Sequence, residues 1–526
     1  MTEAVLAEAV TALVWGWLPG AWVASAVLAL YYAILGVLSL YGVHRMALVA
    51  GYLATRRAAA SRPHRAARPA SAPSDACLPV VTVQLPLYNE MYVARRLVDA
   101  VCALDWPREK LEIQVLDDST DETVGIVAAE VERRRREGYR IRHLHRGVRT
   151  GFKAGALAAG AARAEGGLLA VFDADFVPRP DFLRRAVPAF DDPRVGMVQA
   201  RWDHLNRDYS LLTRVQAIFL DGHFVVEHTA RHRAGCFFNF NGTAGIWRRA
   251  AIAAAGGWSH DTLTEDLDLS YRAQLAGWRF VYLPELTVPS ELPVDVNGFK
   301  SQQYRWAKGS IQTARKLLGR IVRARLPWKV KLEAAVHLTN NASYPLMVGL
   351  SLLLFPAMAI RRGGPLTTIL AVDLPLFLAA TVSVCVFYAV SEAGTGRRRW
   401  RRELLLLPAL MAAGIGLSVN NARAVLSGLR ERGGEFVRTP KYRIERRGED
   451  WKRKRYRAGR SLSVVGEGLL ALYLLACFLY AAATGMWASL PFLWLFLQGY
   501  AFVFLLSVGP ALGRAPRPAL GRPVES

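Results

Sequence analysis

The chain has few cysteines, and they follow no pattern. Five are spread over its 526 residues, without the paired or metal-ligand spacing that a disulfide framework or a cysteine metal site needs. We therefore expect them to pack as small apolar residues, with the soluble part of the chain in a reducing compartment. They are Cys77, Cys102, Cys236, Cys385 and Cys477.

Acidic residues are also in short supply. The sequence has 43 Asp and Glu against 67 Lys and Arg, which gives a formal net charge of +24. Such an excess fits a nucleic-acid partner, anionic lipid, or the orientation of membrane helices. The basic runs adjoin apolar segments, as at 397–402 and 452–455, and no nucleic-acid-binding motif accompanies them. We therefore predict a membrane orientation signal and no nucleic-acid partner.

Charge is missing altogether from long apolar stretches. Residues 20–43 carry none, and about 20 apolar residues suffice to cross a bilayer. The basic region that opens a cleavable signal peptide is also missing, since Glu3 and Glu8 precede this stretch, so we expect an anchor that stays in place. The sequence therefore predicts a polytopic α-helical membrane protein, with the lipid bilayer as a partner. Further candidate spans are 343–360, 366–391, 464–484 and 487–509.

One apolar segment, 403–427, is ambiguous. Both of its flanks are strongly basic, and a crossing there would move the basic 430–460 stretch to the outside. We predict an interfacial or re-entrant helix with both ends in the cytoplasm, which gives five crossings, an outside N-terminus and a cytoplasmic block over 51–330. A sixth crossing is the alternative.

Three apolar runs that follow the first span predict strands, at 78–85, 111–116 and 167–172. Polar residues end each run, and helical patterns separate them. This order describes a Rossmann-like, doubly wound α/β sheet with a site at its carboxyl edge. Asp173 and Asp175 follow the third run, where hard oxygen ligands suit Mg²⁺ or Mn²⁺ on a diphosphate, although an isolated Asp-X-Asp is more often a solvated turn.

Six motifs then occur in a recognisable order. They are Pro86-Leu-Tyr-Asn-Glu90, Asp117-Asp118-Ser119, Lys153-Ala-Gly-Ala-Leu157, Asp173-Ala-Asp175, Thr264-Glu265-Asp266 and Gln302-Gln-Tyr-Arg305-Trp306. This order resembles the processive inverting glycosyltransferases of family 2 over about residues 78–310. The wording is closest to the cellulose synthase-like mannan and glucomannan synthases, as in 114–121 and 240–245. The resemblance implies an α/β GT-A nucleotide-sugar-binding domain inserted between transmembrane helices, and a hexosyltransferase of the EC 2.4.1 type.

The resemblance also implies roles for the acidic and basic residues of these motifs. Asp266 would be the catalytic base, with Glu265 shaping the site, although Thr-Glu-Asp before an apolar pattern also makes a good helix N-terminus. Asp175, and less directly Asp173, would bind the metal on the diphosphate. Lys153 would neutralise phosphate charge, although a lone lysine is usually solvated. The residues implied to frame or contact the nucleotide are Pro86, Tyr88, Glu90, Asp117 and Asp118, of which the last two could equally form only a polar turn.

Three further positions share one helix face. Gln302, Arg305 and Trp306 stand at i, i+3 and i+4, which suits contacts to the diphosphate and the acceptor sugar. The alternative is an amphipathic helix on the membrane surface, and both can hold. The acceptor side would be lined by Asn241, Gly242 and Thr243.

A late segment, 436–441, resembles the gating loop of cellulose synthase. Phe436, Thr439 and Lys441 match its pattern, and Thr439 and Lys441 would close over the nucleotide. Arg438 departs from the pattern, because it stands at the position of a valine. A loop that contacts the nucleotide must be cytoplasmic, as the re-entrant interpretation of 403–427 requires.

The expected function is transfer of hexose from GDP-mannose, GDP-glucose or UDP-glucose to a growing β-linked polysaccharide, coupled to export of the polymer. One alternative is a non-processive transferase that makes a glycolipid on ceramide or diacylglycerol; another is a catalytically inactive sugar-nucleotide-binding scaffold. The expected partners are a UDP- or GDP-linked donor and a polysaccharide or lipid-linked acceptor, and an accessory export subunit is left open. The expected location is the inner or plasma membrane, with the catalytic domain in the cytoplasm.

The predicted organisation follows from these readings. In order along the chain it comprises an N-terminal segment with the first membrane helix (1–50), a basic Pro/Ala linker (51–77), the GT-A domain (78–300), amphipathic interface helices (301–342), membrane helices two and three (343–391), the interfacial or re-entrant helix (403–427), a cytoplasmic gating-type loop (428–462), membrane helices four and five (463–510) and a tail (511–526).

Overall fold

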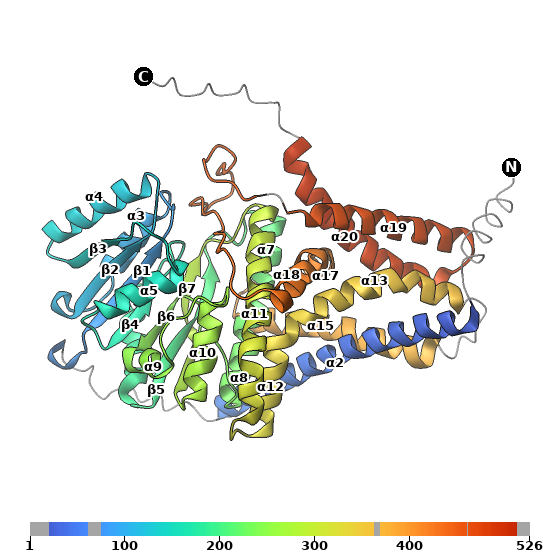
Figure 1. Cartoon of the computed structure of the whole chain (residues 1–526), viewed down its shortest axis with the longest axis horizontal. Helices are drawn as coiled ribbons and strands as arrows, with labels where there is room; N and C mark the ends of the chain where they lie inside the picture. The colour runs from blue at the N-terminus through green and yellow to red at the C-terminus, as the bar shows by residue number, and fades with distance from the viewer. Residues whose placement is uncertain (1–19, 62–74, 362–368, 460, 513–526) are drawn as a thin grey trace.

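The computed structural model describes residues 20–61, 75–361, 369–459 and 461–512 (Figure 1). An α/β part lies at one end of the molecule and a bundle of long helices at the other. The predictions for residues 1–19, for linker residues 62–74 and for the tail beyond 512 lie outside the described residues.

The α/β part is built on a seven-stranded sheet with the order β3-β2-β1-β4-β6-β5-β7. Its first four strands in this order are parallel, β6 runs antiparallel to both β4 and β5, and β7 is parallel to β5. The three predicted strands are present as β1, β2 and β4, and the expected α/β fold class is confirmed. The strands are β1 Val81–Leu87, β2 Leu111–Asp117, β3 Arg140–His145, β4 Leu168–Val171, β5 Val195–His204, β6 Gly245–Arg248 and β7 Arg279–Ser290.

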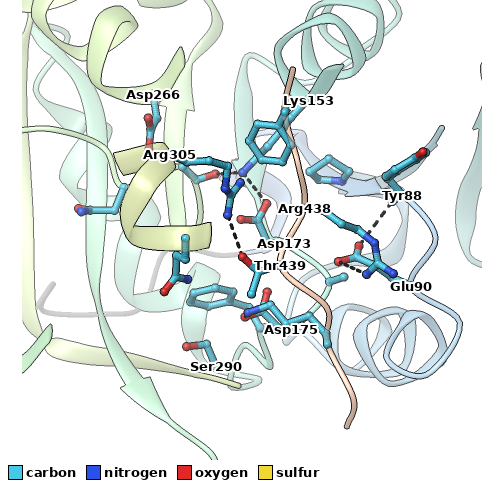
Figure 2. A pocket seen from close by; sticks show the side chains of 18 of the residues that line it. Tyr88, Glu90, Lys153, Asp173, Asp175, Asp266, Ser290, Arg305, Arg438 and Thr439 are labelled. Atoms are coloured by element: carbon cyan, nitrogen blue, oxygen red, sulfur yellow. Dashed lines mark hydrogen bonds and ion pairs between the residues drawn. The ribbon is translucent and has the colours of Figure 1, made fainter. Parts of the chain in front are cut away.

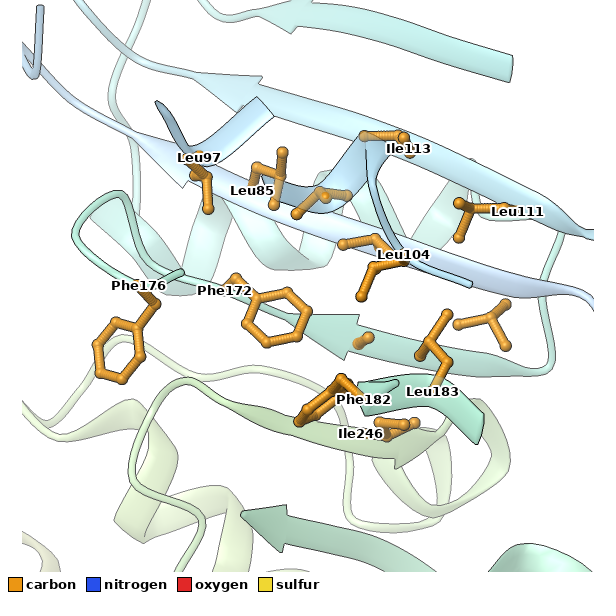
Figure 3. Packing of buried hydrophobic residues seen from close by; sticks show 14 of the residues in the cluster. Leu85, Leu97, Leu104, Leu111, Ile113, Phe172, Phe176, Phe182, Leu183 and Ile246 are labelled. Atoms are coloured by element: carbon orange, nitrogen blue, oxygen red, sulfur yellow. The ribbon is translucent and has the colours of Figure 1, made fainter. Parts of the chain in front are cut away.

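Two apolar clusters cover the two faces of this sheet. Alternate side chains of each strand point to opposite faces, so each strand contributes to both clusters. In β4 and just after it, Ala170 and Phe172 belong to one apolar cluster, whereas Val171 belongs to the other. Figure 3 shows the first cluster, in which Leu97 of α3 (Ala94–Cys102) and Phe182 of α6 (Phe182–Ala186) pack against the strand residues. Near-continuous apolar strands are what a doubly covered parallel sheet requires.

Short helices surround the sheet. The helix α7 begins with a capping box, in which the Ser210 hydroxyl accepts from the Thr213 backbone N–H and the Ser210 N–H donates to the Thr213 hydroxyl. A π-helix, η4, follows α7 directly. These elements are α3 Ala94–Cys102, α4 Thr123–Arg136, α5 Phe152–Ala162, α6 Phe182–Ala186, α7 Leu211–Asp221, η4 Gly222–His228, α8 Thr229–Arg233, α9 Arg249–Ala254 and α10 Glu265–Leu275.

Five segments of the described chain are helices long and apolar enough to cross a membrane. They overlap all five predicted spans, and the molecule is an integral membrane protein. Four of them are α2 Gly20–Ser61, α15 Leu374–Gly394, α19 Ser463–Ala483 and α20 Leu490–Leu512, and the fifth runs through α12 Trp328–Thr339 and α13 Ser343–Ile360. Two bounds were wrong: the first helix continues to Ser61, so residues 51–61 of the predicted linker are helical, and the second apolar segment begins at Trp328, within the predicted interface helices.

The ambiguous segment forms two helices, α17 Leu407–Gly416 and α18 Ser418–Arg430, which meet at an angle of 40°. The short α16, Trp400–Glu403, precedes them. A bend of this kind fits either a broken span or a re-entrant segment, so the number of crossings, five or six, stays a prediction.

Two helices join the α/β part to the bundle, α11 Val296–Arg323 and α12 Trp328–Thr339, and they cover the segment predicted as interface helices. On α11, the ammonium group of Lys300 is fully buried and lies 2.6 Å from a carboxylate oxygen of Glu467 in α19. The same ammonium group donates to the hydroxyl of Ser507 in α20, at 2.7 Å. The helix that carries Arg305 is therefore fixed to the bundle by a buried ion pair.

Candidate active site

One cavity opens at the carboxyl edge of the sheet, and it brings together nearly all of the predicted site residues (Figure 2). Only Asp117 and Thr243, among the predicted residues, do not line it. Those that do are Pro86, Tyr88, Glu90, Asp118, Lys153, Asp173, Asp175, Asn241, Gly242, Glu265, Asp266, Gln302, Arg305, Trp306, Phe436, Arg438, Thr439 and Lys441.

The acidic pair Asp173 and Asp175 follows β4, and each carboxylate is held by a lysine. The Lys153 Nζ lies 2.5 Å from Asp173 Oδ1, and the Lys441 Nζ lies 2.6 Å from Asp175 Oδ2. Burial raises the pKa of Asp173, against the opposing charge of Lys153. Each carboxylate therefore lies next to a positive charge, which is the ammonium group of a lysine.

Asp266 lies in the first turn of α10. Its Oδ1 accepts a hydrogen bond from the Leu267 backbone N–H at 2.8 Å. The space beside its Oδ2 depends on Gly242, since a Cβ there would stand 3.0 Å from that oxygen and φ of Gly242 is +82°. Burial, and then the neighbouring carboxylate of Glu265, raise the pKa of Asp266 to about 7. Such a carboxyl group can accept a proton near neutral pH.

The helix-cap alternative for Thr264-Glu265-Asp266 finds no support in the side chain of Thr264. Thr264 precedes α10, but its hydroxyl makes no capping bond to the helix. That hydroxyl lies instead 3.4 Å from the hydroxyl of Thr313 in α11.

Asn241 is held by two histidines of the π-helix η4. Its Nδ2 donates to His223 Nε2 at 2.9 Å, and its Oδ1 accepts from His228 Nε2 at 2.5 Å. Because His223 Nε2 accepts, the proton of that ring is on Nδ1, which donates to Glu227 Oε2 at 3.0 Å. Burial lowers the pKa of His228 well below its usual value, so this ring is neutral. The amide of Asn241 is thus fixed in one orientation at the cavity wall.

Arg305 and the segment 436–441 meet across the cavity. Arg305 Nη2 donates to Thr439 Oγ1 at 3.1 Å, and the Arg305 guanidinium carbon lies 4.3 Å from the centre of the Phe436 ring. Burial lowers the pKa of Arg305 to about 10, which leaves it charged at neutral pH. With Lys441 on Asp175, the segment contacts both α11 and the acidic pair along the wall of the cavity.

Arg438, the departure from the gating pattern, has a local explanation. Its Nη1 lies 3.8 Å from Glu90 Oε1, and its guanidinium carbon lies 4.1 Å from the centre of the Tyr456 ring. Burial raises the pKa of Glu90 to about 7, and Arg438 opposes this effect. The arginine therefore offsets the charge of a carboxylate that has lost most of its water.

The two predicted residues outside the cavity are buried and hydrogen-bonded. Asp117 ends β2, where it accepts from His143 Nε2 and from the Ser119 backbone N–H, each at 2.9 Å. Burial alone would raise the pKa of Asp117, but these hydrogen bonds outweigh it and lower the pKa. Thr243 Oγ1 accepts from the backbone N–H of Asp173 at 2.9 Å, so it orients the metal-ligand candidate.

Sequence reasoning missed several residues that line this cavity, among them Arg149, Trp202 and Glu291. Arg149 and Trp202 line the cavity, and Glu291 lines it while its two carboxylate oxygens accept from the backbone N–H groups of Tyr442 and Arg443. Trp202 near the end of β5 and Glu291 just after β7 follow the same rule as Asp173, since side chains near the carboxyl ends of parallel strands face the site. This rule could have identified Trp202 and Glu291 from the sequence, but not Arg149, which lies in a turn.

The family model and the relatives that this chain matches agree on one family of enzymes. Residues 79–309 match the family described as glycosyltransferase like family 2. The chain is 36% identical over 463 residues to the probable glucomannan 4-beta-mannosyltransferase 9 of Oryza sativa subsp. japonica, a match covering 84% of this chain and 83% of the relative. It is 49% identical over 250 residues to glucomannan 4-beta-mannosyltransferase 2 of Arabidopsis thaliana, which covers 47% of each chain, so this match spans about half of that relative.

Among solved structures, the mannosyltransferase PcManGT from Pyrobaculum calidifontis, in complex with GDP-Man and Mn²⁺, is similar with a TM-score of 0.48 and 21% identity, covering 77% of this chain and 99% of that one.

The sheet, its acidic cavity and the apolar helices define a polytopic membrane glycosyltransferase. The chain belongs to glycosyltransferase family 2, on the strength of its match to the rice relative. The resemblance seen in the sequence is confirmed.

Proposed function

We propose that this protein transfers mannose from GDP-mannose to the non-reducing end of a growing β-1,4-linked mannan or glucomannan, with inversion at the anomeric carbon. The names of the two plant relatives support the sugar and the linkage. The single observation that carries the chemistry is that Asp266, a carboxylate with a pKa of about 7, shares one cavity with the Asp173 and Asp175 pair.

Asp266 is the proposed base. The acceptor hydroxyl attacks C1 of the mannosyl group from the face opposite the diphosphate, Asp266 takes the hydroxyl proton, and the C1–O bond to phosphate breaks. GDP leaves with the bonding electrons. A base works best when its pKa lies near the operating pH, and Glu265 contributes to that by raising the pKa of Asp266.

A divalent cation fits the acidic pair. Asp173 and Asp175 offer hard carboxylate oxygens at a strand end, and both already lie against ammonium groups, so this position suits positive charge. We propose that they hold Mg²⁺ or Mn²⁺, which when bound supplies charge to offset the departing diphosphate. Lys153 and Arg305 line the same cavity and can donate to phosphate oxygens.

We place the α/β part on the cytoplasmic side of an inner or plasma membrane, where the nucleotide-sugar donor would reach it. The basic flanks of the apolar segments support this side. The polymer then passes outward along the membrane helices of the same chain, and Asn241 and Trp306 contact its acceptor end.

The test uses the full chain in lipid nanodiscs with Mn²⁺ or Mg²⁺ and GDP-mannose labelled in the sugar. We expect a polymer that an endo-β-1,4-mannanase digests. Asp266→Asn is expected to lower the rate by at least about a thousandfold while GDP binding stays within about twofold, because only proton transfer is lost. The matched control is Asp261→Asn, an exposed aspartate that pairs with Lys316.

Two results would contradict the proposal. Label that appears only in a short glycolipid would exclude polymer synthesis. An active Asp266→Asn variant would remove the assignment of the base.

A further inference from the structure

Arg149 lines the cavity but has no part in the chemistry proposed above. It lies in the turn between β3 and α5, and its guanidinium carbon stands 3.6 Å from the centre of the Tyr88 ring. Figure 2 shows Tyr88 and Glu90 on one side of the cavity, Asp266 on the other, and Asp173 between them. Arg149 therefore belongs to the end of the cavity away from the proposed base.

This arrangement fixes which part of a donor Arg149 meets, given the proposed function on which this inference rests. The reacting sugar carbon must lie near Asp266, and the diphosphate near Asp173 and Asp175. A nucleoside diphosphate sugar is linear in this order, so its base lies beyond the acidic pair, at Tyr88 and Arg149.

The hydrogen bonds of Arg149 leave one edge of its guanidinium free. Nη1 donates to the backbone carbonyl of Phe436 at 3.4 Å. Nε is buried and has no hydrogen-bond partner within the described parts of the chain, and no bond of Nη2 is found there either. Nε and Nη2 lie on the same edge and form the two-pronged donor that arginine uses in bidentate contacts. A buried donor without a partner costs stability, so its presence at a cavity wall points to a ligand.

We propose that Arg149 recognises the guanine base of the donor, by donating from Nε and Nη2 to O6 and N7. These two acceptors are adjacent on guanine, and the arginine fork matches them. Adenine carries an amino donor in place of O6, and uracil has no adjacent pair of acceptors. The residue would therefore select guanosine donors over adenosine and uridine donors.

The surroundings of Arg149 suit a stacked purine. Besides Tyr88, its guanidinium carbon lies 5.0 Å from the centre of the Phe152 ring and 5.9 Å from that of Phe436. Aromatic rings on which both a base and a guanidinium can stack hold the two groups near one plane, as bidentate hydrogen bonds require. Phe436 belongs to the segment 436–441 at the cavity wall, so base recognition and the position of this segment are coupled through Arg149.

The first test varies the base on the unmodified protein. Binding of GDP, IDP, ADP, UDP and 7-deaza-GDP to the full chain in nanodiscs with Mn²⁺ is measured by calorimetry. IDP keeps O6 and N7, so we expect it to bind within about threefold of GDP. ADP, UDP and 7-deaza-GDP lose one or both acceptors, so we expect them to bind about ten- to a hundredfold more weakly.

The second test varies the arginine. Arg149→Met removes the donors, and Arg149→Lys keeps the charge without the fork. In both variants we expect the GDP to ADP affinity ratio to fall to about one, with ADP affinity itself little changed in Arg149→Lys. The control is Arg142→Met, a partly exposed arginine of β3 that pairs with Glu165 at the surface.

The outcomes separate this inference from the proposed function. A GDP to ADP ratio that survives in both Arg149 variants, or equal weakening of all nucleotides in Arg149→Lys, would overturn the role of Arg149 while leaving a guanosine donor in place. Tighter binding of UDP than of GDP by the unmodified protein would instead contradict the proposed donor. Equal affinity for GDP and 7-deaza-GDP would exclude the N7 contact.

Discussion

Two carboxyl groups of the cavity, Asp266 and Glu90, have pKa values raised to about 7 by loss of solvent. Their neighbours differ. Asp266 lies next to Glu265, whose charge raises its pKa further, whereas Glu90 faces Arg438, which opposes the shift. In the proposed mechanism Asp266 takes the acceptor proton, and Glu90 lies at the other end of the cavity.

The pH dependence of the reaction follows from this assignment. A base must be deprotonated, so activity is full above the pKa of Asp266 and is lost as pH falls through it. We expect kcat/KM for GDP-mannose to fall about tenfold per unit below pH 7. The control is Glu90→Gln, which removes the other group of similar pKa and should keep the acidic limb. A limb that disappears in Glu90→Gln would assign the titration to Glu90 and contradict the role of Asp266.

The residues that follow strands could be predicted from local sequence patterns. The parts of the fold that depend on pairing between distant segments could not. Asp173 and Asp175 follow an apolar run that forms β4, so their place at the sheet edge could be read from the sequence. The antiparallel strand β6 could not be predicted from the sequence, because it has only four residues and its partners β4 and β5 are distant in the chain. Arg149 was missed because it lies in a turn, where neither strand nor helix periodicity points toward the cavity.

The π-helix η4 is another element that no periodicity predicts, and it acts through several residues at once. The chain of hydrogen bonds that begins at Asn241 continues through Glu227, whose Oε2 accepts from Arg231 Nη1 at 3.2 Å. Arg231 Nε in turn donates to Glu333 Oε1 of α12 at 2.8 Å. Glu333 Oε2 in turn lies 2.7 Å from His44 Nε2 on α2. Asn241 is thus connected to the first membrane helix by side-chain contacts alone.

Glu227→Gln tests whether η4 positions Asn241 for the acceptor. The carboxylate can only accept, so it holds the proton of His223 on Nδ1. The amide of glutamine can also donate to Nδ1, which lets the ring present N–H to Asn241 and break that bond. We expect the ratio of polymer formed to GDP-mannose hydrolysed to fall about tenfold, with the KM for GDP-mannose within about twofold.

The matched control for this element is Glu132→Gln, an exposed carboxylate of α4 that pairs with Arg136. If transfer and hydrolysis fall together in Glu227→Gln, the substitution acts on the whole site, and a specific role toward the acceptor is excluded.

At the scale of the whole molecule, the helix α11 and the membrane bundle share a buried charge pair. Lys300 precedes Gln302 and Arg305 on α11, and Glu467 lies within α19, so the pair couples the position of the cavity wall to the bundle. Figure 1 shows α11 between the sheet and the membrane helices. The sequence predicted both segments but not this link, since the two residues are 167 positions apart.

Lys300→Met should therefore destabilise the protein more than an ordinary core substitution. It leaves Glu467 buried without its cation, which costs about 3–5 kcal/mol, whereas replacing both members by apolar residues is often close to neutral. We expect a clear loss of thermal stability in nanodiscs for Lys300→Met, and recovery of most of it in Lys300→Met with Glu467→Leu. Activity should return less fully than stability in the double variant, because Ser507 also loses its bond to the ammonium group and α11 is held less firmly. Equal stability of the single and double variants would show that the charge of Glu467 is solvated after all, and the pair would then not be what fixes Arg305 to the bundle.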